Sequence, residues 1–300
     1  MSSGLSPVGD VTEAKPATPS ESARTSPAAD NDKKKSHWRR WRLLIQVVIG
    51  VSFLLAWQYL PTVDALADRY KFLNSFFISS PTEIADWVWK LMAGSGTNGI
   101  TLWPYLRTTV WAALIGVTIG LSLGALAGLI FSNSKKLAEV IRPFIVLANS
   151  VPRVAIIPIF VVIAGPTARA SILSVVAVVF FLGFFNALQG GSSIPQRMLD
   201  NARLLGASQI SIMRTIRLPM VLSWTFAAVP NAISFGLVVA VTTELLAGVK
   251  GMGQLLQTSM VNANADLTFA VIVVLSVVGL VMYGAATLLR DFLLRWDVKS

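Results

Sequence analysis

The sequence contains no cysteine, and His37 is its only histidine. Disulfides, thiolate metal ligands and cysteine nucleophiles are therefore excluded. A single histidine also argues against a histidine-based metal site or a catalytic triad. Charged residues make up only 13% of the 300 residues, against roughly 25% in a typical soluble domain. Because hydrophobic residues reach 54%, too little polar surface remains to coat a soluble globule. We expect an all-α integral membrane protein that is not an enzyme, with no catalytic residues and no metal site.

Six apolar runs reach or approach the length of about 20 helical residues that a hydrocarbon core of about 30 Å requires. The predicted spans are 43–60, 109–131, 143–165, 170–188, 221–247 and 267–289. Residues 1–42 are rich in Ser, Thr, Ala and Pro and then in basic residues, so we expect a disordered basic cytoplasmic tail. Residues 61–108 are expected to form an external segment, and residues 109–297 the core of the protein.

The distribution of basic residues predicts how the spans are oriented. Of the 25 Lys and Arg residues, 18 lie in segments that are cytoplasmic if the N-terminus is inside, and six lie in the outside segments. Cytoplasmic loops are enriched in positive charge, so we expect both termini inside and a multi-pass protein of the cell (inner) membrane. The basic run 33–42 could indicate nucleic-acid binding, but a span follows at once, and we interpret the run as a cytoplasmic anchor with no nucleic-acid partner.

A capping box marks a short helix in the external segment. Ser80 stands at the N-cap, Pro81 at the first helical position and Glu83 at the third. The helix is amphipathic, with an apolar stripe formed by Ile84, Trp87, Val88 and Leu91. Spacing alone favours a helix that lies on the membrane surface or packs on the spans, and a docking surface for an external partner is the alternative.

Four glycines recur every fourth residue in the second predicted span: Gly116, Gly120, Gly124 and Gly128. They lie on one face of the helix, where the absence of side chains lets another helix approach closely. The pattern predicts tight helix packing. Packing within the chain is favoured, and a subunit interface is the alternative.

The segment 189–219 between the fourth and fifth spans predicts two short helices around Gly206. Pro195 can begin the first helix, Gly206 can end it in a left-handed conformation, Ser208 can cap the second helix, and Pro219 can open the next span. Several apolar residues lie on this loop outside the membrane: Leu204, Leu205, Ile210, Ile212, Met213 and Ile216. They need cover, either from their own membrane domain or from a soluble partner that takes the loop as a helix in a groove.

This loop resembles the EAA motif of binding-protein-dependent ABC transporter permeases. The family pattern runs Glu-Ala-Ala, three residues, Gly, nine residues, Ile, one residue and Leu-Pro, and the spacing matches throughout. The matching residues are Asp200 in place of Glu, Asn201 in place of the first Ala, Ala202, Gly206, Ile216, Leu218 and Pro219. The resemblance covers residues 75–297 and implies six transmembrane helices of the type I ABC importer permease kind.

Further motifs resemble the branch of that family that imports sulfonates, taurine, nitrate or thiamine-precursor pyrimidines. They lie at 79–81, 152–155, 205–208 and 251–253. The resemblance implies a homodimer in the lipid bilayer, an external solute-binding protein and two cytoplasmic ABC ATPase subunits, into which the loop 189–219 couples. The sequence has no Gly-x-x-x-x-Gly-Lys-Ser/Thr phosphate loop. ATP is therefore expected to be bound by a separate subunit, with no cofactor in this chain.

Polar residues within the spans are candidates for a translocation path. Arg153 lies near the middle of the third predicted span, where it could attract an anion, or Pro152 could break the helix and let Arg153 reach the cytoplasmic face. The other candidates are Asn149, Asn231, Ser234, Thr243 and Glu244. Each of them could instead make an interhelical hydrogen bond.

These observations predict the transmembrane permease of an ATP-driven importer that moves a small solute, such as a sulfonate, taurine, nitrate or a thiamine-precursor pyrimidine. The alternative is an ion-coupled secondary transporter. Such a transporter would favour several ionisable residues at mid-depth, where this chain offers only Arg153.

The orientation can be tested with single cysteines, because the chain has none of its own. In intact cells, a cysteine at Ser211 should react only with reagents that enter the cytoplasm, whereas a cysteine at Asn98 should react from outside. Labelling of position 211 by an impermeant reagent would contradict the predicted topology.

Overall fold

The computed structural model describes residues 27–59, 79–95 and 99–294, and every regular element among them is a helix. The predicted tail up to residue 26 and Asn98 lie outside the described residues. Contacts divide the chain into two compact units, Met1–Ala56 and Trp57–Ser300.

The first unit contains most of a long helix, α1, which runs from Pro27 to Tyr59. Its apolar part, Leu44–Tyr59, matches the first predicted span. The helix begins well before residue 43, so the basic run is helical and differs from the disordered tail that composition suggested. Lys and Arg are good helix formers, which allows the apolar helix to extend back through the basic run.

Four helices of the second unit are long and apolar enough to cross a membrane. They are α4 (Leu102–Ser132), α7 (Ala168–Ser192), α11 (Val229–Ala247) and α13 (Ala265–Leu293). Helix α4 starts within the segment predicted as external, and α7 extends into the predicted loop 189–219.

The third and fifth predicted spans are each divided into two helices. The third consists of α5 (Lys135–Ser150) and α6 (Arg153–Ala164), and the fifth of α10 (Leu218–Ala227) and α11. Each break lies at a proline, Pro152 before α6 and Pro230 in the first turn of α11. Proline lacks the N–H that would continue the hydrogen-bond ladder, so a helix tends to end before it.

The glycine stripe of α4 lies directly on α7. A β-carbon at Gly120 would lie 3.0 Å from the carbonyl oxygen of Val176, and one at Gly124 would lie 2.7 Å from the backbone nitrogen of Phe184. Both are backbone atoms of α7, so the two helices touch main chain to main chain. The geometry matches packing within the chain, the favoured alternative for this stripe.

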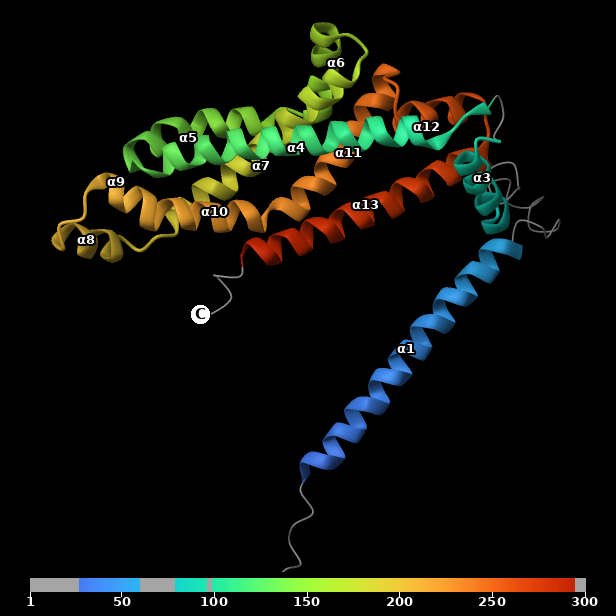
Figure 1. Ribbon diagram of the computed structural model, residues 1–300, viewed down its shortest axis with the longest axis horizontal. Coiled ribbons are helices and arrows are strands. Elements are labelled where there is room, and N and C mark those ends of the chain that lie inside the picture. Colours follow the sequence, from blue (N-terminus) through green and yellow to red (C-terminus); the bar gives the residue numbers. More distant parts are fainter. Residues whose placement is uncertain (1–26, 60–78, 96–98, 295–300) are drawn as a thin grey trace, which may run out of the picture. The chain divides into compact units, whose positions relative to one another are not determined.

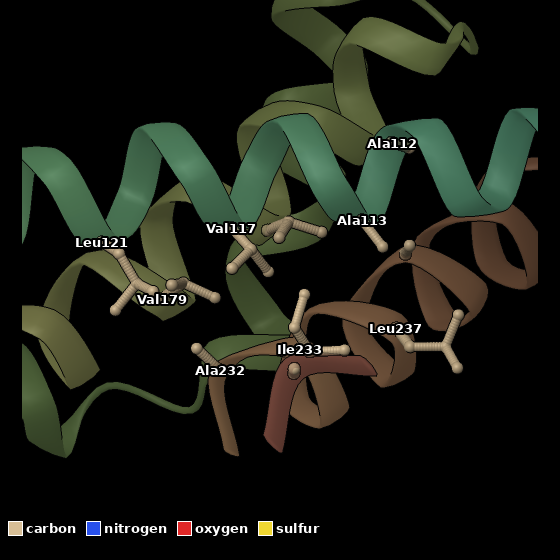
Figure 2. Close-up of a cluster of buried hydrophobic side chains, with 11 residues drawn as sticks. Ala112, Ala113, Val117, Leu121, Val179, Ala232, Ile233 and Leu237 are labelled. Carbon is tan, nitrogen blue, oxygen red and sulfur yellow. The ribbon is translucent and has the colours of Figure 1, made fainter. Parts of the chain in front are cut away.

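Helix α11 completes this packing (Figure 2). Ala113, Val117 and Leu121 of α4 pack with Val179 of α7 and with Ile233 of α11 in one buried hydrophobic cluster. Most members are small or β-branched, which suits a core in which van der Waals contact replaces the hydrophobic effect.

The second unit has two opposite ends that matter for function (Figure 1). Helices α8 (Gln196–Leu204) and α9 (Gln209–Ile212) lie at one of them, called here the α8–α9 end. Helices α3 (Pro81–Ala93) and α12 (Met252–Val261) lie at the other, the α3–α12 end.

Helix α3 has the predicted cap. The Ser80 hydroxyl accepts a hydrogen bond from the backbone N–H of Glu83 at 3.4 Å, and Gly94 ends the helix with a φ of 71°. Ile84 and Leu91 are buried in a second apolar cluster with residues of α12 and α13. The apolar stripe therefore packs on the chain's own helices rather than remaining free.

We expect Gly124→Leu to destabilise the protein by about 1–3 kcal/mol or more, since overpacking strains a tight contact and here the neighbour is backbone. Gly284→Leu is the matched control, because a β-carbon at Gly284 of α13 meets nothing within 4 Å. Thermal unfolding in detergent measures both variants. Equal unfolding temperatures would contradict the packing argument.

Candidate functional site: the α8–α9 loop and the buried carboxylate

The loop between α7 and α10 folds as its residues predict. Pro195 is the N-cap of α8, and the Ser208 hydroxyl caps α9 by accepting from the N–H of Ser211 at 3.2 Å. Between the two helices Gly206 has a φ of 83°, in the left-handed region that glycine adopts without strain. A π-helical turn, η4 (Met213–Arg217), then leads into α10.

The apolar residues of this loop divide into a buried set and an exposed set. Ile212 packs with Ile194 and Leu199 in a small cluster of the loop's own residues. Leu204 and Leu205 are 86% and 89% exposed, and Ile210 is 67% exposed. The buried set gives the loop a fixed shape, and the exposed set leaves an apolar surface uncovered.

The residues that match the EAA pattern take different positions in this loop. Asp200 is exposed, and its carboxylate accepts hydrogen bonds from Gln196 and from Arg203, each at 3.0 Å. Asn201 and Pro219 are also exposed. Ala202, Ile216 and Leu218 are half-buried, and Gly206 has open space where a side chain would project.

Arg217 is a buried residue that the sequence pattern did not single out. It is 8% exposed, and its Nη1 donates a hydrogen bond of 2.6 Å to the carbonyl oxygen of Ser132, the last residue of α4. Burial, and next the nearby Arg203, lower the pKa of Arg217. Arg217 lies within the segment that resembles the EAA motif, but its partner Ser132 is 85 residues away in the sequence. No local sequence signal could therefore have identified the contact.

The predicted path residues do not meet in one place within a single chain. Arg153 is the first residue of α6, directly after the break at Pro152. Asn231 and Ser234 lie on the exposed face of α11, whereas Thr243 and Glu244 near its other end are fully buried. The side chains of Asn149 and Arg153 are not among those described. The role of these residues in a path stays a prediction.

Glu244 joins three helices at the α3–α12 end. Its Oε2 accepts hydrogen bonds from the hydroxyl of Thr109 on α4, at 2.7 Å, and from the N–H of Gly253 in the first turn of α12, at 3.0 Å. The Thr109 hydroxyl in turn accepts from the N–H of Met252, at 2.8 Å. A carboxylate at a helix N-terminus satisfies N–H groups that have no partner within the helix. Glu244 thereby fastens α12 to α4 and α11.

Two glycines make this arrangement sterically feasible. A β-carbon at Gly251 would overlap the Glu244 carboxyl group, and one at Gly253 would lie 2.7 Å from the β-carbon of Glu244. The motif at 251–253 is therefore needed for close approach of the backbone to the carboxylate. Sequence reasoning singled out both the glycines and Glu244 without connecting them.

A cavity of about 530 Å³ lies between α4, α5 and α7. Its wall contains aromatic rings, including Phe131 and Phe185, with Glu139, Gln189 and Ser192 as polar groups. No local sequence pattern marks this cavity, because its lining comes from three separate helices. Among the described residues, no group of three or more His, Asp or Glu side chains could hold a metal.

More than half of the chain matches a known protein family. Residues 116–295 match the family described as "Binding-protein-dependent transport system inner membrane component". The matched region runs from the glycine stripe of α4 through α13, and it includes the α8–α9 loop and Glu244.

Three curated proteins are similar over most of the chain. A probable ABC transporter permease protein of Haemophilus influenzae is 24% identical, covering 86% of this chain and 99% of its own. The riboflavin transport system permease protein RibX of Chloroflexus aurantiacus is 25% identical, with coverages of 75% and 82%. The taurine transport system permease protein TauC of Escherichia coli is 23% identical, with coverages of 89% and 96%.

Among solved structures, a chain of the MetNI methionine ABC transporter in an inward-facing conformation has a TM-score of 0.52 and 21% identity. The match covers 69% of this chain and 97% of that one. At this level of identity the likeness indicates a shared fold.

We expect Glu244→Ala to destabilise the protein, because each buried N–H or hydroxyl left without its acceptor costs about 1–3 kcal/mol. Glu244→Gln keeps one acceptor oxygen and should lose less. Thr242→Ala is the control, since the Thr242 hydroxyl bonds only within its own helix. Thermal unfolding and protease cleavage at α12 measure the effect, and an unfolding temperature of Glu244→Ala equal to that of the control would contradict it.

Proposed function

The chain belongs to the inner membrane components of binding-protein-dependent transport systems, the permeases of ABC importers, and from this premise we propose that two copies carry a small anion into the cell. The protein is a multi-pass permease of the inner membrane and not itself an enzyme, and ATP is bound by a separate ATPase. The finer features proposed below are its topology, its coupling surface and its solute.

We propose six membrane crossings with both termini in the cytoplasm. They comprise the apolar part of α1, then α4, the α5–α6 pair, α7, the α10–α11 pair and α13. Four of these crossings contain a helix that is long and apolar enough to span the membrane, namely α4, α7, α11 and α13. In the α5–α6 pair, the apolar helix is the shorter α6. The excess of basic residues in the inside segments supports this orientation.

The observation that carries the coupling proposal is the exposed apolar surface of the α8–α9 loop. Leu204, Leu205 and Ile210 project from a loop whose shape is held by its own buried cluster. A rigid helical loop with exposed apolar residues fits the groove of a soluble partner. On the inside of the membrane this partner is the ABC ATPase, and ATP-driven movement of the ATPase would be passed to the spans through the loop.

An anionic solute is supported by the position of Arg153 and by the resemblance to sulfonate and taurine importers. Arg153 opens α6 at a break within a predicted span, and broken helices in transporters commonly contribute to solute sites. Identity alone does not choose the solute, because the relative named for riboflavin and the relative named for taurine are similarly distant. Asn149, Asn231, Ser234, Thr243 and Glu244 remain proposed polar groups along the path.

The solute proposal is tested by uptake into proteoliposomes that contain the permease, its ATPase and the external binding protein. Taurine, an alkanesulfonate and nitrate are compared with riboflavin and a thiamine-precursor pyrimidine. ATP-dependent uptake of nitrate, of the alkanesulfonate or of taurine, a zwitterion whose sulfonate group is anionic, would support the proposal if it is reduced in Arg153→Ala while the ATPase still co-purifies. Uptake of only the uncharged solutes would contradict it.

We expect Gly206→Trp to weaken co-purification of the ATPase by about tenfold or more, equivalent to about 1.4 kcal/mol. A side chain at this left-handed residue adds strain of about 1–2 kcal/mol and projects into the space that the partner would occupy. Transport should fall with it, while membrane insertion stays normal.

Gly99→Trp is the matched control for that variant. Gly99 also has a positive φ, of 69°, and open space around it, but it lies before α4 at the α3–α12 end. It should leave ATPase association unchanged. Equal association of both variants with the ATPase would mean that the loop is not the coupling surface.

A further inference from the structure

The α8–α9 loop joins the membrane helices through a π-helical turn. Helix α9 continues without interruption into η4 (Met213–Arg217) and then into α10. Single π-turns inside helices are rare and are frequently found at functional sites. Because a π-turn holds more residues per turn than an α-helix, it changes which side chains of the following residues face the neighbouring helices.

The side chain that faces inward at the end of this turn is Arg217. Its Nη1 donates to the Ser132 carbonyl oxygen at 2.6 Å, and the residue is 8% exposed. The last carbonyl groups of a helix have no partner within the helix and carry its negative dipole end, which a cation satisfies well. Arg214 lies on the same turn but is exposed, so the turn has one buried and one exposed guanidinium group.

The end of α4 is also packed closely against α7 beside this contact. A β-carbon at Gly191 of α7 would overlap the Ser132 side chain, so α7 lies directly against the last turn of α4. A β-carbon at Gly190 would lie 2.9 Å from the β-carbon of Trp224, which places α10 against the same turn of α7. Ser132 is thus held between α7 and Arg217.

Helix α4 then runs to the opposite end of the unit as one element. It has 31 residues, which at 1.5 Å per residue gives a length of about 45 Å. Near its other end Thr109 bonds with Glu244 and with Met252 of α12. A displacement of Ser132 along the helix axis is therefore passed to the α3–α12 end without an intervening loop.

We propose that Arg217 is the positioning residue that transmits movement of the α8–α9 loop to α4, through its hydrogen bond to the Ser132 carbonyl. This inference rests on the proposed coupling function of the loop. Arg217 is buried beneath the loop, so this role requires no direct contact with the ATPase or the solute. Its part is to make the loop and the end of α4 move as one body when the ATPase shifts.

The test separates ATP hydrolysis from transport in proteoliposomes that contain the permease, the ATPase and the binding protein. In Arg217→Ala, ATPase association and hydrolysis should persist while solute moved per ATP falls by about tenfold, within the usual range of coupling between sites. Arg217→Lys keeps a cationic donor and should restore most of the ratio. Arg290→Ala, which removes an arginine of α13 outside the loop 189–219, should behave as wild type.

A second measurement does not depend on the folding of Arg217→Ala. Spin labels on cysteines at Asn133 and Ser211, both exposed, report the distance between the end of α4 and the loop. In the otherwise unchanged chain this distance should stay constant between the ATP-free and ATP-bound states. A distance that changes between the two states would overturn the inference.

The outcomes distinguish this inference from the function on which it rests. A wild-type chain that neither binds an ATPase nor transports would overturn both. Normal wild-type transport together with an unchanged transport-to-ATP ratio in Arg217→Ala would overturn only the role of Arg217. Loss of ATPase association in Arg217→Ala would also overturn it, since the arginine would then only hold the shape of the loop.

Discussion

The backbone contact between α4 and α7 is the constraint on which the rest of the second unit depends. In a bilayer, apolar side chains gain little by leaving lipid for protein, so helices associate through close van der Waals contact. The four glycines of α4 provide that contact over about three helical turns, with the α7 backbone against Gly120 and Gly124. Helix α11 then adds Ile233 and Leu237 to the same cluster. Without the close approach of α4 and α7, α11 would have no groove to fill.

The two polar clusters lie at opposite ends of this packed pair. At one end Arg217 satisfies the terminal carbonyl of α4, and at the other Glu244 satisfies the first N–H groups of α12 together with Thr109 of α4. Both clusters provide hydrogen-bond partners for backbone groups at a helix end, which have none within their own helix. In each case an ionisable side chain from another helix binds these groups, so each capped end also joins two helices.

Local chemistry made much of this structure predictable. Pro195, Gly206 and Ser208 define the ends of the loop helices because a cap or a left-handed residue depends on neighbours only a few positions away. The contact of Arg217 with Ser132 and that of Glu244 with Thr109 could not be predicted in the same way, because these partners lie 85 and 135 residues away in the sequence. The cavity beside Glu139 has the same origin, since three helices must pack before it exists. The family resemblance singled out this loop as the expected coupling element. Only the packing distinguishes its buried Ile212 from Leu204 and Leu205, which are exposed.

The break between α5 and α6 restricts what can surround the third span. Helix α5 ends at Ser150, α6 begins at Arg153, and Val151 between them is 44% exposed on the single chain. The carbonyl groups at such a break cannot all be paired within their own helix, and hydrocarbon tails offer no hydrogen-bond donor. Irregular backbone at membrane depth is tolerated only against protein or water. In the proposed topology, this side of the third crossing therefore faces protein or water, and lipid tails contact the other faces.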